Sequence, residues 1–426
     1  MAVTIPASPT GSMTVADQSL IYTLLTGTAS PLPAGFRIWV KVYENGTSAA
    51  DLISTLYLTP NTNKTAFFNL AEVVKGRVSV DDRRYGLTNV IHEPISTGLY
   101  MTRSNNNVKL YTVSVGEFNG STEGSQDASA TIYLIDGHFQ ISQGYDPGFA
   151  NYYGTANTVK YWLTDRPTAS NVITIDAAEE DEGVCAFLNR SAVSNVEQLT
   201  ILLYDEAGAF ITGTTTTILI NTATGGQLPG ATSQYYYGYL CYFGILPANI
   251  DAASGLLTAN PTWGHYTITP QQTSFAVQKG NAIRVNKNCR PVKNTPVQLA
   301  WANTLGGWDY LRFDGRDLKT VTRQEKTYRK IIGDYDAATF AFTSFDREKT
   351  PYQVEATEAY QLNGILTSDE YALFQYCFRS KNVMAKIDGS WIPVILKESS
   401  LQVESDVTSK VYIATVNVEL AQSIRC

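Results

Sequence analysis

The chain has 426 residues, a net charge of −7 at pH 7, and a charged content of only 17% beside 26 tyrosines. A negative balance without a local cluster of lysine or arginine gives no electrostatic basis for a nucleic-acid partner. No stretch approaches the roughly 18 apolar residues of a membrane-spanning helix, and the N-terminus lacks the pattern of a signal peptide. We therefore expect a protein folded in a cytoplasm, without membrane insertion, whose tyrosines favour β structure with uncharged, aromatic surfaces.

The first 145 residues are expected to form a β-sandwich-like domain. Apolar and polar residues alternate, as in half-buried strands, over residues 36–42, 53–58, 109–115 and 130–135. Residues 64–76 change period and end on Gly76, which predicts a short helix closed by a glycine cap. Residues 116–129 are polar and glycine-rich, which is typical of a long loop.

Residues 149–281 are expected to form a second β-sandwich-like domain, after a break at Pro147 and Gly148. Its strands are predicted at residues 160–164, 172–175, 199–204, 209–212, 233–245 and 262–277. Both of the first two domains are therefore predicted to be all-β.

The strand at residues 233–245 is the most aromatic of these. Tyr235, Tyr237 and Tyr239 share one face of it. Such a face favours packing against another sheet or a neighbouring subunit, and stacking on sugars is the alternative.

Residues 283–426 are expected to form an α+β domain that contains one prominent β-hairpin. Trp301 and Trp308 flank a reversal at Gly306 and Gly307, where paired glycines accept positive φ values. The two indole rings are expected to close over one another as a structural clasp.

A capping box predicts the helix of this third domain. Thr367 can accept a hydrogen bond from the Glu370 amide while Glu370 reaches back. Tyr371, Phe374 and Phe378 then fall on one face of the helix, which should be its buried face.

A second hairpin is predicted at Asp388 and Gly389, because this dipeptide is a strong signal for a two-residue turn. Pro393 in the following strand cannot donate a ladder hydrogen bond, so that strand should lie at a sheet edge or a bulge. The chain as a whole is thus predicted to be mainly β: two β-sandwich-like domains followed by a C-terminal α+β domain.

No group of residues points to catalysis, a cofactor or a metal ion. His92, His138 and His265 are scattered, without the spacing of metal ligands. Phosphate-binding loops and nucleophile elbows are absent from the sequence. Residues 176–182 hold five carboxylates, which we interpret as a solvated acidic loop because calcium loops space their ligands alternately. We therefore expect no enzymatic activity and no cofactor.

The five cysteines carry no disulfide pattern either. They are odd in number, far apart and never in Cys-x-x-Cys spacing: Cys185, Cys241, Cys289, Cys377 and Cys426. We expect all five thiols to be reduced and most of them to be buried.

Three phrases resemble a family of large virion proteins of tailed bacteriophages and prophages. They are LAWANTLGGWDYLRF at residues 299–313, WLTDRP at residues 162–167, and LYLTPNTNKTAFFNLAEVVKG at residues 56–76. The resemblance implies a structural protein of the virion, of the tail or baseplate, without enzymatic activity. It carries over no functional residue.

The leading hypothesis is therefore a structural and assembly protein of a phage particle. Its expected partners are other copies of itself and other phage virion proteins; the alternative is a tail protein that binds host cell-surface glycan. Open strand edges and a low surface charge favour a homo-oligomer. Its contacts are expected from residues 116–129 and from an irregular segment at residues 329–352.

Overall fold

A computed structural model describes most of the chain. It leaves out residues 1, 10–12, 85–87, 96–97, 105, 138–151, 153–159, 189–197, 221–239, 273–276, 290–293, 317, 331–332, 334–346, 398–402, 407–410, 423 and 426. The described part is mainly β, which confirms the predicted fold class. It divides into two compact units: unit 1 is Met1–Arg290 with Trp301–Tyr310, and unit 2 is Pro291–Ala300 with Leu311–Cys426.

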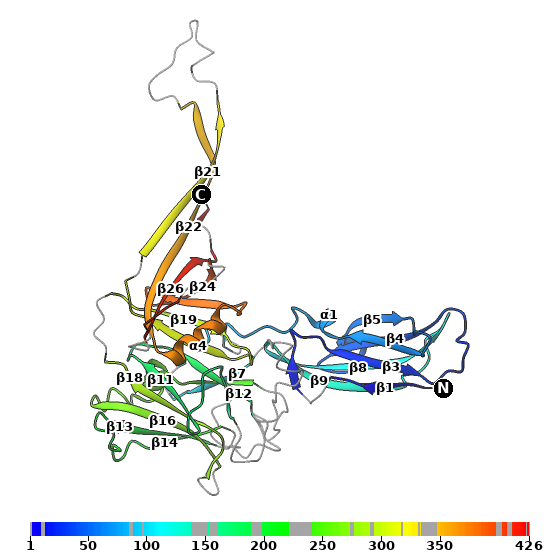
Figure 1. The fold of residues 1–426 in the computed structure, drawn as a ribbon, viewed down its shortest axis with the longest axis horizontal. Coiled ribbons are helices and arrows are strands. Elements are labelled where there is room, and N and C mark those ends of the chain that lie inside the picture. Colours follow the sequence, from blue (N-terminus) through cyan, green and yellow to red (C-terminus); the bar gives the residue numbers. More distant parts are fainter. Residues whose placement is uncertain are drawn as a thin grey trace. The chain divides into compact units, whose positions relative to one another are not determined.

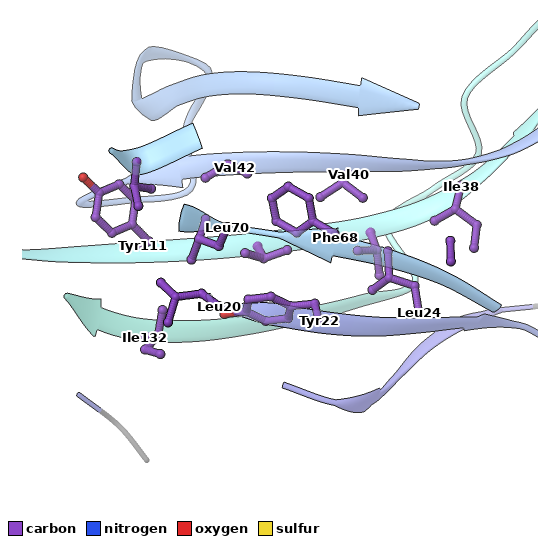
Figure 2. Close-up of a cluster of buried hydrophobic side chains, with 14 of the residues drawn as sticks. Leu20, Tyr22, Leu24, Ile38, Val40, Val42, Phe68, Leu70, Tyr111 and Ile132 are labelled. Atoms are coloured by element: carbon purple, nitrogen blue, oxygen red, sulfur yellow. The ribbon is translucent and has the colours of Figure 1, made fainter. Parts of the chain in front are cut away.

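The N-terminal part of unit 1 is sandwich-like, as predicted, with two sheets around one core (Figures 1 and 2). The first sheet has the order β1 (Val3–Ala7), β3 (Ile21–Thr26) and β6 (Thr65–Asn69). The second has the order β2 (Met13–Val15), β9 (Ala128–Ile135), β8 (Val108–Asn119), β4 (Phe36–Glu44) and β5 (Leu52–Leu58). A 3-10 turn, η1 (Ala49–Asp51), precedes β5. In Figure 2, Phe68 of the first sheet lies beside Val40 of the second, and Tyr22 and Tyr111 belong to the same buried cluster.

The helix predicted at residues 64–76 is mostly wrong. Strand β6 takes the first half, because Ala66 and Phe68 point into the core while Phe67 is exposed, which is the period of a strand. Only one helical turn follows, α1 (Ala71–Val74), and Gly76 lies beyond it with a φ of +79°.

The glycine-rich loop is also shorter than predicted, because β8 continues to Asn119. Gly116 is a strand residue: a Cβ atom there would lie 2.5 Å from the indole ring of Trp39. The sheet therefore selects glycine at this position for close approach and not for a turn.

The rest of unit 1 holds two more sheets (Figure 1). One has the order β10 (Trp162–Leu163), β12 (Val184–Leu188), β15 (Leu240–Gly244) and β7 (Met101–Arg103). The other has the order β11 (Val172–Ala177), β18 (Ala282–Lys287), β16 (Trp263–Gln272), β13 (Gln198–Asp205) and β14 (Thr216–Leu219), with β17 (Val277–Gln278) beside β16. The helix α3 (Pro247–Ser254) follows β15.

The strand predicted at residues 209–212 is reduced to a single bridge between Tyr204 and Phe210. Strand β14 takes its place beside β13. Within this part of the chain, β11 pairs with β18 in parallel, and the other described pairs are antiparallel.

Unit 2 is built on a nine-stranded sheet and the helix α4 (Ser368–Cys377). The sheet order is β20 (Trp308–Phe313), β19 (Val297–Ala302), β23 (Val383–Ile387), β24 (Ser390–Leu396), β26 (Val411–Leu420), β22 (Lys349–Leu366) and β21 (Leu318–Arg329). Two short strands, β25 (Val403–Asp406) and β27 (Ile424–Arg425), pair with β26 and β22. The hairpin β19–β20 is shared, because residues Trp301–Tyr310 belong to unit 1.

The capping box is confirmed. The Thr367 side chain accepts from the Glu370 amide, and the Glu370 carboxylate accepts from the Thr367 amide at 2.8 Å. The buried face differs from the predicted one, since Leu373 and Cys377 are buried with Phe374. Tyr371 is only partly buried and stacks on Tyr412 of β26.

The Asp388–Gly389 turn is confirmed, with φ values of +50° and +78°, but the placement of Pro393 is wrong. Strand β24 lies inside the sheet, between β23 and β26. Pro393 is tolerated because the pairing with β26 begins only at Val394, and the Pro393 carbonyl still accepts from the Ala421 amide at 3.0 Å.

The segment at residues 329–352 is less irregular than predicted. Strand β21 runs to Arg329 and β22 begins at Lys349, so the described ends of this segment belong to a long two-stranded ribbon (Figure 1).

Replacing Thr367 by alanine should lower the free energy of unfolding of unit 2 by about 1 kcal/mol, because α4 loses the hydroxyl that accepts at its N-cap. Urea denaturation combined with hydrogen exchange of the α4 amides measures the loss. Ser368→Ala is the matched control and should change little. Equal losses for the two variants would contradict the role of the cap.

Candidate functional site

The hairpin tip, defined as residues 303–310, is closed by one asparagine. The Asn303 side-chain oxygen accepts from the amides of Leu305 at 3.1 Å and Gly307 at 2.7 Å. Its side-chain nitrogen donates to the Leu163 carbonyl at 2.9 Å. A single buried side chain thus satisfies the turn and fastens it to β10.

The two glycines of the tip are required by close packing. Gly306 has a φ of +82°, and a Cβ atom there would lie 2.6 Å from the Ile135 side chain. A Cβ atom at Gly307 would lie 2.4 Å from the Leu163 carbonyl oxygen. Positive φ explains only the first glycine, while the approach of a neighbouring element constrains both.

Asp309 joins the hairpin to the WLTDRP phrase. Its carboxylate is buried and accepts from the Thr164 hydroxyl and from the Asp165 amide at 2.9 Å. The Asp165 carboxylate accepts in return from the hydroxyl of Thr304 and, at 2.9 Å, from its amide. Arg166 donates to the Tyr310 carbonyl. Burial raises the pKa of Asp309, while Arg166 and Thr164 act in the opposite direction.

On its other side the tip is held by a network around Asp81. The Trp308 indole donates to the Asp81 carbonyl at 2.9 Å. The Asp81 carboxylate accepts from the hydroxyls of Ser104 at 2.6 Å and Tyr242 at 3.1 Å. Asn107 donates to Tyr242 at 3.0 Å and to the Gly306 carbonyl at 2.5 Å. These buried polar groups are satisfied by one another, as a stable interior requires.

His92 completes the packing of the tip. The Tyr310 hydroxyl accepts from the Val184 amide at 2.9 Å and lies 2.7 Å from Nδ1 of His92, to which it can donate. The ring meets Trp308 edge-on, with centroids 4.6 Å apart. Burial, reinforced by Arg84, lowers the pKa of His92 to about 3, so this histidine is neutral near pH 7.

The predicted clasp between the two tryptophans is absent from the described ring contacts. Trp308 packs on His92, and Trp301 is fully buried with no hydrogen-bond partner for its indole nitrogen among the described residues. The sequence of the hairpin alone cannot predict this arrangement, because the ring that packs on Trp308 is His92, from the segment before β7.

The hairpin tip is closely packed and hydrogen-bonded to its described neighbours. The cavity beside Asp309 and Cys185 has a volume of about 10 Å³, which is room for one water molecule at most. Among the described residues, no group of His, Cys, Asp or Glu is arranged to hold a metal ion.

The other predicted features have mixed outcomes. Tyr235, Tyr237 and Tyr239 lie outside the described residues, as does His138. The acidic run is not fully solvated: the Asp181 carboxylate is buried and accepts from the Ala178 amide at 2.8 Å.

Most of the described cysteines are buried, as predicted. Cys185, Cys241 and Cys377 are free and buried, and Cys289 is free and exposed. Cys426 lies outside the described residues.

A second candidate site is the exposed ribbon formed by β21 and β22. All twelve residues of β21 are exposed, and β21 is the last strand of its sheet. Large apolar side chains on this ribbon are open to solvent, with exposed fractions of 54% for Leu318, 56% for Val321, 48% for Tyr328 and 62% for Tyr352. An edge of this kind can pair with another strand, and its apolar side chains can add contact area.

Neither a scan against protein-family models nor a search of curated proteins finds a match to this chain. Within the described part, no helix is long and apolar enough to cross a membrane.

Replacing Asp309 by alanine should destabilise unit 1 by about 3–5 kcal/mol, because Thr164, the Asp165 amide and Arg166 lose a buried acceptor or counter-charge. Urea denaturation followed by tryptophan fluorescence measures the change. Glu206→Ala, an exposed carboxylate in a turn of the same unit, is the control and should stay within about 0.5 kcal/mol of the parent. A loss below 1 kcal/mol for Asp309→Ala would contradict the joint.

Acid should weaken the fold through His92. His92 takes up a proton near pH 6.5 in the unfolded chain and only near pH 3 in the folded chain. The stability that neutral His92 contributes is therefore fully present above pH 6.5 and is lost as the pH falls from 6.5 toward 3. At pH 5 the expected loss is about 2 kcal/mol relative to pH 7. Urea midpoints at the two pH values measure it.

His92→Gln should lose this component of the pH dependence, and His265→Gln, at a half-exposed histidine, should keep it. An identical slope for His92→Gln and the parent would show that His92 does not titrate in this way.

Proposed function

We propose that this chain is a non-enzymatic structural component of a bacteriophage particle, of the tail or baseplate. In this role it contacts other copies of itself and other virion proteins. The phage assignment rests on the three phrases that resemble virion proteins. The observation that favours assembly is the β21–β22 ribbon, in which β21 is solvent-exposed and pairs with no described strand other than β22.

A ribbon of this kind favours a protein that works in an assembly. A two-stranded hairpin is marginally stable in water by itself, and a third strand pairs with β22 only over residues 359–366 and at residues 355–356. The paired residues of β21 and β22 beyond these positions would therefore gain most stability from a partner that covers them. An extended segment of another chain can add a strand to an exposed sheet edge, with main-chain hydrogen bonds that provide affinity.

The hairpin tip supports the same function in another way. Two of the three phrases that carry the resemblance, at residues 162–167 and 299–313, are hydrogen-bonded to each other through Asp309 and Asp165. What the two phrases share is therefore a structural contact. A role in holding a shape, which a particle subunit needs, accounts for both phrases without any catalytic step.

Purified particles of the phage or prophage that encodes this chain should contain it in several copies. Mass spectrometry of the particles counts the copies, and electron microscopy of the intact particle locates the chain in the tail or baseplate. Absence of the chain from purified particles, or a single copy that touches no other copy of itself, would overturn the proposal.

A glycan array separates this proposal from receptor binding. If the aromatic face is structural, Tyr237→Ala lowers the melting temperature and the parent protein binds no host glycan. The opposite result is that the parent binds a host-surface glycan and Tyr237→Ala loses binding at an unchanged melting temperature. That result would replace the structural hypothesis for Tyr237 by the alternative, a receptor-binding tail protein.

A further inference from the structure

The free edge of β21 carries a positive charge. Four of its twelve residues are basic and one, Glu325, is acidic, so the strand has a net charge of +3; the basic residues are Lys319, Arg323, Lys326 and Arg329. Strand β22 adds one lysine and two glutamates, which leaves the ribbon at +2. Strand β21 is thus basic in a chain whose net charge is −7.

The positive charge is only partly neutralised within the ribbon. Lys319 pairs with Glu358 at 2.7 Å, and Arg323 pairs with Glu325 at the same distance. Arg329 lies 3.7 Å from Glu348. These pairs are exposed and therefore weakly bound, so their basic members can exchange to carboxylates of a partner.

The charge argues against pairing of β21 with β21 of another copy. Two such strands side by side would bring six net positive charges together, and like charges on neighbouring strands are destabilising. It argues for a contact with the remainder of another copy. Outside residues 318–366 the chain has a net charge of −7.

The edge also has the length for a specific contact. Twelve residues at ~3.3 Å each give an edge of roughly 40 Å. Unpaired amides and carbonyls along this edge can hydrogen-bond an extended segment, and the exposed Val321 and Tyr328 offer apolar contacts beside them.

We propose that the β21 edge binds the acidic body of a second copy of this chain, head to tail, by accepting an extended segment along the edge. This inference rests on the proposed function and names the partner of the ribbon. A head-to-tail contact joins two different surfaces, so it generates a ring or an open row of copies and not an isolated two-fold dimer. Opposite charges also make the contact sensitive to salt.

Zero-length carbodiimide crosslinking of a mixture of isotopically light and heavy full-length chains tests the geometry. Crosslinks that join Lys319 or Lys326 of one copy to carboxylates of another copy outside residues 318–366 are expected. Crosslinks between copies that connect only ribbon to ribbon, or the absence of any crosslink between copies, would overturn the inference.

Charge reversal tests the energetics. Lys326, which has no ion pair among the described contacts, is changed to glutamate, and the exposed Lys75 of the N-terminal sandwich is changed in the same way as the control. By mass photometry and sedimentation, Lys326→Glu should weaken self-association by about tenfold or more, while Lys75→Glu leaves it within about twofold. Raising the salt concentration from 50 to 500 mM should weaken the parent similarly.

The outcomes separate this inference from the proposed function. If the chain is found in particles in several copies but Lys326→Glu assembles like the parent, the inference fails and the proposed function stands. If the chain is absent from particles, the proposed function fails whatever the ribbon does. Far-ultraviolet circular dichroism of each variant confirms that it is folded.

Discussion

The structure depends on burying carboxylates that must find hydrogen-bond donors. A charge removed from water costs several kcal/mol unless it is paired, and the hairpin tip places Asp309 and Asp81 in the interior. The donors come from far along the chain: the Thr164 hydroxyl is 145 residues from Asp309, and the Tyr242 hydroxyl is 161 residues from the Asp81 carboxylate that it donates to. Each of these bonds is satisfied only when the distant segments have already met, so the joint specifies one arrangement of unit 1.

The ribbon of β21 and β22 differs from the joint because its charged residues stay in water. Strand β21 has no buried residue, and its edge is protected by basic side chains and by an irregularity in register between Lys326 and Thr327. Such devices prevent indiscriminate pairing of an open edge. They still permit pairing with an acidic partner, since the protecting charges then attract instead of repel. One chain therefore combines a buried, hydrogen-bonded joint with an exposed edge strand.

Burial also keeps several titratable groups of the joint uncharged. Burial holds the Tyr310 hydroxyl and the Cys185 thiol in their neutral forms, because it raises the pKa of both groups well above its ordinary range. His92 is kept neutral by the same effect in the opposite direction. Perturbed titration of this kind often marks catalytic sites, and here each shifted group is buried in the interior of unit 1.

The sequence by itself determined the local structure wherever neighbours along the chain decide the outcome. The alternation at residues 36–42, the capping box at Thr367 and the Asp388–Gly389 turn depend on side-chain period, one side-chain oxygen and positive φ, which are local properties. The tertiary structure decided everything that depends on what packs against a segment. Pro393 could lie inside a sheet because its neighbouring strand pairs only beyond it.

The hairpin shows the same division. Its two strands and its turn could be predicted, but the partner of Trp308 could not, because His92 is brought to it from more than 200 residues away. The pattern of residues 64–76 alone does not distinguish a short strand from a helix. Strand β6 forms there because Ala66 and Phe68 both enter the core between the two sheets. The charge of β21 follows directly from the sequence, but only the sheet order shows that β21 is an edge strand. Periodicity and turn chemistry are encoded locally, whereas burial and pairing are properties of the whole fold.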